Sequence, residues 1–416
     1  MSVPFTVSSR YKWEALALLW FAFFFNQADR QIFGVVLPLI RDDLHLTDAE
    51  LGFIASALGW TLALTVPFAG WISDRYPRNW VITLSLCFWS AATLFTGVSS
   101  TLGQFILLRS VATGGGEAFY APAANALISD LHRETRARAM AIHQTALYVG
   151  VVASGGVAGW IGQTWGWRPA FFVFGACGLI LAAVFALRLR RPESAATTTT
   201  QMPEVVPQSI VRLFLAKPTA ILLTVAFTAV VFVNVGYLAW MPTFLHERFG
   251  LSLTEAGFSS MFYHHASALA GVLLGGWWSD RAVQSDPNAR VKLQCLGLAL
   301  GAPFIVLMGT GTTQFAVLAG SAGFGFFRGI FEANLYAVLF DVIAPKLRAS
   351  ASGFMIMFAF LTGACSPYLL GVLKPTLGLA RGLASLGVVY LLGAIAIALA
   401  WRVYAARDRL PVSSVA

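Results

Sequence analysis

The sequence predicts an all-α membrane protein with twelve transmembrane helices in two six-helix halves. Three observations support this fold class: apolar segments of membrane-spanning length recur along the whole chain, charged residues are scarce, and one short motif occurs at the same place in both halves. Of the 416 residues, 57% are hydrophobic and 11% are charged, whereas soluble domains contain about 25% charged residues. Because lipid offers no hydrogen-bond partners, these segments must satisfy their backbone groups internally, as helices do.

The apolar segments each have about 20 residues or more, enough for a helix to cross the ~30 Å hydrocarbon core of a bilayer. The first, fourth and tenth contain ionisable residues, which a helix that faces a cavity can carry. The first segment lacks a small-residue cleavage site, so we expect it to remain as a membrane helix. The twelve predicted spans lie near residues 13–38, 50–73, 79–97, 102–128, 138–162, 168–189, 217–242, 255–279, 292–310, 314–340, 349–371 and 381–404.

The longest polar interruption separates the sixth span from the seventh. It contains four consecutive threonines, residues 197–200, and two prolines, Pro203 and Pro207. This composition is typical of a flexible linker. We therefore expect an N-terminal half at 1–190, a cytoplasmic linker at 191–216 and a C-terminal half at 217–416.

The basic residues indicate the orientation in the membrane. With both termini in the cytoplasm, the inside segments hold twenty Lys and Arg residues and the outside loops hold five, as the positive-inside rule requires. The net charge of +9 therefore reflects membrane orientation and does not indicate a nucleic-acid partner, because the basic residues lie in short loops between apolar spans. We expect a multi-pass protein of the cell membrane, which is the inner membrane in a Gram-negative bacterium.

A six-residue motif occurs twice. Gly70–Arg75 (GWISDR) follows the second span, and Gly276–Arg281 (GWWSDR) follows the eighth, 206 residues later. A weaker repeat relates Asp130 and Arg136, after the fourth span, to Asp341 and Arg348, after the tenth. Parallel six-helix repeats are an architecture of transporters. Ion pairs in such loops can close one side of a transporter in one state and break in another, and we predict five gating residues: Asp74, Arg75, Arg78, Asp280 and Arg281.

The pattern G-x-x-x-D-R between the second and third spans resembles the signature loop of the major facilitator superfamily. Pro77 stands where that family commonly has Gly, and Asn79 stands where it commonly has a second basic residue. The second copy lacks a basic residue three positions after Arg281. The resemblance covers essentially the whole chain, and it implies the major facilitator fold and transport by alternating access of two halves.

Within this superfamily the sequence is most similar to the Spinster branch and its bacterial homologues. The residues that carry this resemblance are, in chain order, Asp29-Arg30, Leu37-Pro38, Asp43-Leu44, Gly116-Glu117-Ala118, Pro122, Asp130, Arg136 and Gly166-Trp167-Arg168. The resemblance implies a proton-coupled or facilitative carrier of amphipathic anions, such as lysophospholipids or sphingosine phosphate.

Six ionisable residues lie within the predicted spans: Asp29, Arg30, Arg109, Glu117, Arg328 and Glu332. A charge near the bilayer centre costs at least ~3 kcal/mol on insertion scales, so such residues usually serve a function. We predict that Asp29 and Glu117 form the proton-coupling site, because the proton affinity of a carboxylate changes with its desolvation and with the distance of a nearby arginine.

The remaining polar residues of the spans are candidates for substrate binding. The planar guanidinium of Arg30 suits phosphate and carboxylate, and Tyr120, one turn after Glu117, can hydrogen-bond that carboxylate. Arg328 and Glu332 share a helix face and can pair, so they can bind substrate or serve only structure, and Arg109 can equally be an interfacial anchor. The predicted substrate-binding residues are Arg30, Arg109, Tyr120, His143, Tyr148, Asn234, Tyr237, Arg328 and Glu332. His264 and His265 point in different directions, so at most one of them is expected to face the pore.

The sequence contains no nucleotide-binding loop, no nucleophile elbow and no zinc-binding histidine pair. We therefore predict neither an enzyme nor a bound cofactor or metal, and expect a proton gradient to supply the energy. The predicted function is secondary active transport of an organic anion or anionic amphiphile, by a monomer in the lipid bilayer. Two alternatives remain: a facilitator or symporter of small solutes such as sugar acids or sugar phosphates, and a receptor that retains the transporter fold.

Overall fold

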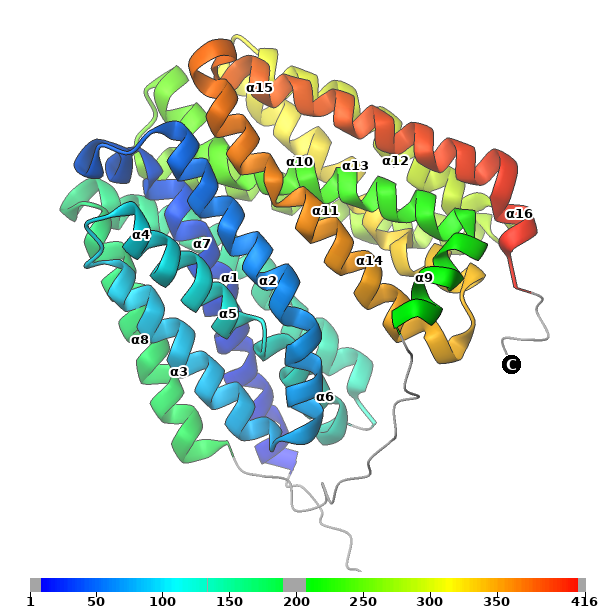
Figure 1. The fold of residues 1–416 in the computed structure, drawn as a ribbon, viewed down its shortest axis with the longest axis horizontal. Helices are drawn as coiled ribbons and strands as arrows, with labels where there is room; N and C mark the ends of the chain where they lie inside the picture. The colour runs from blue at the N-terminus through cyan, green and yellow to red at the C-terminus, as the bar shows by residue number, and fades with distance from the viewer. Residues whose placement is uncertain (1–8, 133, 190–206, 411–416) are drawn as a thin grey trace, which may run out of the picture. The chain divides into compact units, whose positions relative to one another are not determined.

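The computed structural model describes residues 9–132, 134–189 and 207–410 (Figure 1). These residues form helices and short connections and contain no strand, so the all-α prediction is confirmed. The first part of the predicted linker, residues 191–206, lies outside the described residues. The rest of it, which we predicted to be flexible, forms the helix α9 (Pro207–Ala216).

The chain divides into two compact units. The first comprises Met1–Met202 and Leu251–Phe258, and the second comprises Pro203–Gly250 and Ser259–Ala416. Helices of the first unit and its connections are α1 (Ser9–Leu44), α2 (Asp48–Arg75), α3 (Arg78–Thr96), α4 (Leu102–Phe105), η1 (Ile106–Ala112), α5 (Thr113–Glu117), α6 (Tyr120–Leu131), α7 (Arg136–Trp165) and α8 (Trp167–Arg188). Those that follow are α10 (Pro218–Phe249), α11 (Leu253–Ala282), α12 (Ala289–Thr310), α13 (Gln314–Val342), η2 (Pro345–Leu347), α14 (Arg348–Gly363), α15 (Cys365–Leu399), η3 (Ala400–Tyr404) and α16 (Ala405–Asp408).

Local sequence explains several helix ends. A capping box starts α2: the Glu50 backbone N–H donates to the Thr47 hydroxyl, and the Thr47 N–H donates to the Glu50 carboxylate, which satisfies donors that the first turn leaves free. Gly250 ends α10 in the left-handed conformation, with φ 66°, where glycine carries no steric penalty. Gly378 has φ 74° and ψ 157° inside α15, and this kink separates the eleventh predicted span from the twelfth.

The fourth predicted span is not a single helix, although the sequence predicted one. It consists of α4, the π-helix η1, α5 and α6, with a turn at Ala118 and Phe119. Three consecutive glycines, residues 114–116, lower helix propensity here, and Pro122 cannot donate the hydrogen bond that would continue the helix across the turn. Interruptions of this kind are frequent at functional sites.

Seven segments of the described residues are long and apolar enough to cross a membrane, and one of them, Ser350–Asp408, contains two predicted spans. These seven segments account for eight predicted spans. The other four correspond to α1, α11 and α13, which have 36, 30 and 29 residues, and to the interrupted fourth span. Ionisable or polar residues lower the hydropathy of these helices, and helices that face a cavity can carry such residues.

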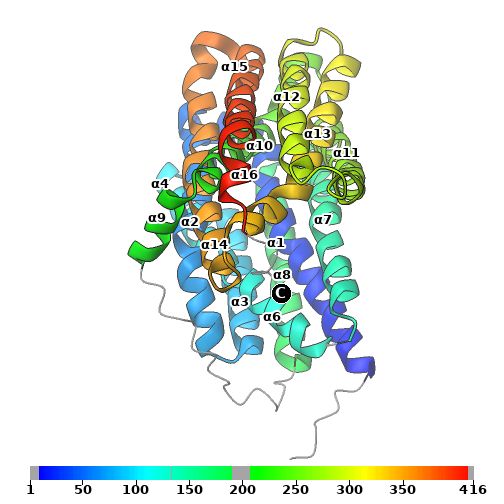
Figure 2. The ribbon, with the colours of Figure 1, turned by 90° about the vertical axis from the view of Figure 1, so that its right-hand side faces the viewer.

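Small residues allow close packing within each unit. In the first unit α1 packs on α7 and α3 packs on α8, and in the second α12 packs on α13 and α15 (Figures 1 and 2). A Cβ atom added at Gly175 of α8 would lie 2.5 Å from the backbone nitrogen of Leu94 in α3. Membrane helices commonly use such small residues at their contacts, because lipid provides no hydrophobic driving force between helices.

Gly175 therefore offers a test of the helix packing. We expect Gly175→Ala to destabilise the protein by about 1–3 kcal/mol, the usual range for overpacking a close contact. The melting temperature of the detergent-solubilised protein measures this loss. Gly353→Ala in α14 is the matched control, because a Cβ atom at Gly353 would meet no atom within 4 Å. Equal melting temperatures for the two variants would contradict the α3–α8 contact.

Candidate functional site

Four of the predicted intramembrane charges meet in the first unit. Asp29 and Arg30 lie on α1, Arg109 lies in η1, and Glu117 ends α5. The Arg30 Nε donates to Glu117 Oε2 at 2.7 Å. The Glu117 side chain is fully buried, whereas 26% of the Arg30 side chain is exposed. These four residues are called the first-unit cluster below.

Arg109 joins this cluster to the backbone of α1. Its Nη2 donates to the carbonyl oxygen of Arg30 at 2.9 Å and to that of Asp29 at 3.4 Å. Arg109 is 3% exposed, so it lies inside the unit and not at an interface with lipid head groups. The Asp29 Oδ2 accepts a hydrogen bond from the Thr93 hydroxyl at 3.3 Å.

The first-unit cluster contains two carboxylates and two guanidiniums, so its formal charge is zero when all four are ionised. Asp29 Oδ1, Glu117 Oε1, and Nε and Nη1 of Arg109 are buried without a hydrogen-bond partner in the described part of the chain. Buried polar atoms of this kind are rare and require an explanation. The arrangement can bind an anion at Arg30 or take up a proton at a carboxylate.

Tyr120 does not form the predicted hydrogen bond with Glu117. Its hydroxyl donates to the carbonyl oxygen of Leu19 at 2.5 Å and lies 3.0 Å from His143 Nε2. The turn between α5 and α6 rotates Tyr120 away from the face that a continuous helix would give it. Tyr120 and His143 are almost fully buried, and the ring of Phe23 stacks on His143 with centroids 4.7 Å apart. The half-buried Tyr148 lies further along α7.

A second cluster of polar residues forms within the second unit, and it is called the second-unit cluster below. Arg328 Nε donates to Glu332 Oε1 at 2.9 Å, so the predicted pair of α13 is present. Arg328 Nη1 donates to Asn234 Oδ1 on α10 at 2.5 Å and to His264 Nε2 on α11 at 2.6 Å. Since a guanidinium only donates, His264 Nε2 is the acceptor in its contact with Arg328.

His264 is a site residue that the sequence did not single out from its neighbour. His265 directs its Nδ1 to the carbonyl oxygen of Met261 on its own helix, at 2.9 Å. The ring of the predicted residue Tyr237 packs on His264, with centroids 4.6 Å apart, and its hydroxyl donates to the Ser260 carbonyl. No periodicity in the sequence distinguishes the two histidines, because the distinction depends on Arg328, 64 residues away.

The two copies of the loop motif have similar surroundings. The Arg75 guanidinium lies over the Trp71 ring at 5.1 Å, and the Arg281 guanidinium lies over the Trp277 ring at 4.0 Å. The side chain of the predicted gating residue Asp74 lies outside the described residues. The tryptophan and the arginine of the motif thus form the same cation–π contact in both copies.

The ion pairs next to the motif are also repeated. Arg78, at the start of α3, pairs with Asp130 near the end of α6. Arg290, near the start of α12, lies 3.6 Å from Asp341 at the end of α13 and 3.8 Å from Asp280. Arg290 thus takes the place of the basic residue that the second copy of the motif lacks. The connection that precedes it, between α11 and α12, is longer than the one between α2 and α3. Comparison of the third span with the ninth, each of which has an arginine near its start, would have identified it.

The weaker repeat has a structural counterpart as well. Arg136 Nη2 donates to the carbonyl oxygen of Ser129, the residue before Asp130, at 3.4 Å. Arg348 Nη2 donates to the carbonyl oxygen of Phe340, the residue before Asp341, at 3.1 Å. Arginines at helix C-termini satisfy free carbonyl groups and interact favourably with the helix dipole. At this helix end, burial raises the pKa of the Asp341 carboxyl, and Arg290 opposes the shift.

Comparisons with known proteins agree with this architecture. The sequence model of the Major Facilitator Superfamily matches residues 19–367. Human Spinster homolog 1 is 29% identical over 395 residues, covering 87% of this chain and 73% of the relative. Protein spinster of Drosophila melanogaster is 26% identical over 398 residues, and these cover 89% of this chain but 64% of the fly protein, just under two thirds of its length.

Two further similarities bear on the family. The probable galactarate/D-glucarate transporter GudP of Bacillus subtilis is 24% identical over 400 residues, covering 89% of this chain and 87% of the relative. The crystal structure of a bacterial homologue of the human lysosomal transporter Spinster, inward-facing and unoccupied, superposes with a TM-score of 0.85. It is 22% identical and covers 98% of this chain and 100% of the other, so it supports the fold. The chain therefore belongs to the major facilitator superfamily of membrane transporters and is related to Spinster proteins and to sugar-acid transporters.

Proposed function

We propose that this protein transports an organic anion by alternating access and couples the movement to protons through the first-unit cluster. The observation that carries the proposal is the ion pair between the partly exposed Arg30 and the fully buried Glu117, 2.7 Å apart. An anionic substrate can approach Arg30 from its exposed side. Glu117 is held by the Arg30 Nε, so a substrate carboxylate or phosphate that binds Arg30 through Nε and one Nη in a bidentate contact competes with Glu117 for that donor.

Substrate binding then promotes protonation. When a substrate carboxylate or phosphate takes the donors of Arg30, Glu117 is left as a buried carboxylate without its partner. An unpaired buried charge is costly, and the group is neutralised by a proton instead. Asp29, held by Thr93 at 3.3 Å, provides a second carboxylate beside the same arginines. Anion and proton therefore enter and leave together, which makes the proton gradient an energy source.

Uptake into proteoliposomes tests this coupling. We expect uptake of the anion to rise with an inwardly directed proton gradient, and a pH-sensitive dye inside the vesicles to report protons entering with substrate. Substrate uptake that does not depend on the proton gradient and moves no protons would contradict the proposed coupling. Ligand binding without any flux would instead favour a receptor with the transporter fold.

Two substrate classes fit a guanidinium-centred site. Amphipathic anions such as lysophospholipids are favoured by the similarity to Spinster proteins, and galactarate or glucarate by the similarity to GudP, which extends over 87% of that protein. Thermal stabilisation of the purified protein by each class separates them. If sugar acids raise the melting temperature and lysophospholipids do not, the substrate is a small hydrophilic anion and not an amphiphile.

The second-unit cluster offers a further anion-binding residue. We expect Arg328→Lys to raise the dissociation constant of the anion about tenfold or more, because lysine cannot reproduce the forked contacts of a guanidinium. Ligand-dependent thermal stabilisation measures the affinity. Arg402→Lys, on the exposed part of η3, is the matched control and should bind as the unaltered protein does. Unchanged affinity in Arg328→Lys would restrict this cluster to a structural role.

A further inference from the structure

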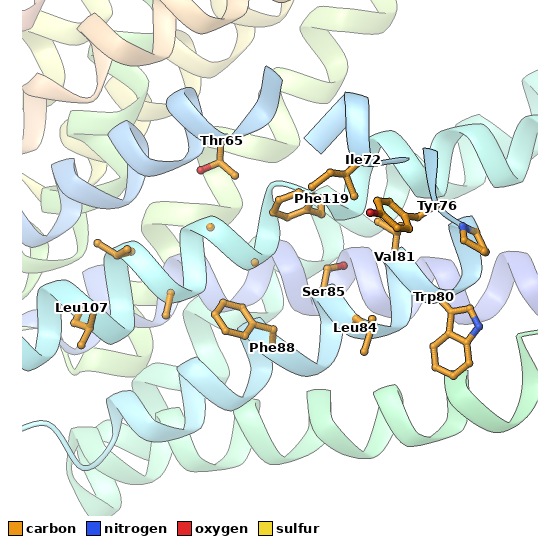
Figure 3. Close-up of a pocket in the computed structure, with 15 residues that line it drawn as sticks. Thr65, Ile72, Tyr76, Trp80, Val81, Leu84, Ser85, Phe88, Leu107 and Phe119 are labelled. Carbon is orange, nitrogen blue, oxygen red and sulfur yellow. The ribbon is translucent and has the colours of Figure 1, made fainter. Parts of the chain in front are cut away.

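An apolar groove lies on the first unit, apart from its charge cluster. Its volume is about 860 Å³, within the range of ~300–1,000 Å³ that is usual for ligand sites. Residues from α2, α3, η1 and α5 line it, together with Phe119 and the connection between α2 and α3. Its main side chains include Tyr76, Trp80, Leu84, Phe88 and Leu107 (Figure 3). Val111 lines it as well.

The groove is separate from the first-unit cluster. Gly115 and Gly116 line the groove, but the next residue, Glu117, is fully buried and bonded to Arg30. Exposed apolar side chains line the groove instead, among them Leu84, Phe88 and Leu107. In a helix that crosses a membrane, such a surface is adapted to hydrocarbon.

The two ends of the groove differ in chemistry. Tyr76 and Trp80 lie toward one end, and Leu107 lies toward the other (Figure 3). Aromatic residues with a polar edge are enriched where the hydrocarbon core meets the head groups. Tyr76 follows Arg75, whose exposed guanidinium lies over the Trp71 ring. This end belongs to the loop that the charge distribution predicts to be cytoplasmic.

We propose that the groove binds an acyl chain of an anionic phospholipid of the cytoplasmic leaflet, with the head group beside Arg75. The apolar lining suits the chain, the aromatic end marks the depth of the head group, and the arginine complements its negative charge. Cytoplasmic leaflets are rich in anionic lipids, which basic residues next to a membrane helix attract. This site is independent of the transported substrate, so it stands whether or not the proposed function holds.

Photolabelling in liposomes tests the acyl chain. A phosphatidylglycerol with a diazirine at the end of one chain should label peptides that cover residues 76–88 and 107–119. We expect Val111→Trp, which fills the groove, to reduce this labelling about tenfold, the effect of losing the burial of roughly two methylene groups. Val173→Trp on α8 is the matched control: Val173 is 45% exposed and Val111 46%, but Val173 does not line the groove. Equal labelling of the two variants would overturn the proposal.

A second arm tests the head group. A phosphatidylcholine with the same diazirine chain should label the groove less than the phosphatidylglycerol, and Arg75→Gln should remove this difference. Arg188→Gln, at the end of α8 where Arg188 pairs with Glu14 at 3.4 Å, should preserve it. Equal labelling by both lipids in the unaltered protein would overturn the assignment of an anionic lipid. A protein–protein crosslink at these peptides in place of lipid would overturn it as well.

Discussion

Replacing Arg30 by methionine should abolish proton-coupled transport and destabilise the protein by at most about 3–5 kcal/mol, the cost of removing one partner from a fully buried ion pair. The fully buried Glu117 would then lose the cation that it pairs with, and the variant bears the cost of an unpaired buried carboxylate or of the proton that neutralises it. Arg109 makes no direct bond with Glu117, because its Nη2 donates to the backbone of α1. Proteoliposome uptake and the melting temperature measure the two losses.

The double variant Arg30→Met with Glu117→Gln separates stability from function. It removes both charges, so most of the lost stability should return, since replacing a whole buried pair is often close to neutral. Transport should not return, because both the anion-binding donor and the proton acceptor are gone. A double variant that transports as the unaltered protein does would show that the pair only holds α1 and α5 together.

Substituting Asp29 by asparagine should prevent accumulation of substrate against its gradient, while exchange of labelled for unlabelled substrate continues. Asparagine keeps the shape and can still accept a hydrogen bond from Thr93, but it cannot bind or release a proton. A pH gradient of one unit supplies about 1.4 kcal/mol per coupled proton, a tenfold accumulation. We expect Asp29→Asn to lose this accumulation.

The matched control for this variant lies on the same helix. Asp42→Asn in α1 also removes a carboxylate, but the Asp42 side chain is exposed and pairs with the adjacent Arg41 at 3.1 Å. Exposed pairs of this kind contribute about 0–1 kcal/mol, so transport should be unchanged. Full accumulation by Asp29→Asn would leave Glu117 as the sole coupling carboxylate, and failure of exchange as well would indicate damage to substrate binding.

The repeated arginine contacts at the helix ends extend the motif that the sequence showed. Both halves place an arginine beside an acid at the end of a span, Arg78 with Asp130 and Arg290 with Asp341. Both also direct a second arginine at the carbonyl just before that acid. The predicted gating residues Arg78 and Asp280 therefore belong to a larger set of contacts. The role of the five predicted residues in closing one side stays a prediction.

The sequence by itself determined the class of the fold, the number of spans, the repeat and which ionisable residues lie within the spans. Hydropathy and loop charge are local properties: in a bilayer of fixed thickness, hydropathy gives the number of helices, and loop charge gives the expected orientation. The interruption of the fourth span was foreseeable in part, because residues 114–116 are all glycine and Pro122 follows. The sequence offered no means of locating the π-helix η1.

Only the tertiary structure decided which charges meet. Glu117 pairs with Arg30, 87 residues away, and has no direct bond with Arg109, which is close to it in sequence. Tyr120 bonds to α1 and not to Glu117, and His264, but not His265, joins Arg328. Each of these pairings depends on the relative rotation and distance of helices that are far apart in the chain. The position of a residue along its own helix does not predict them.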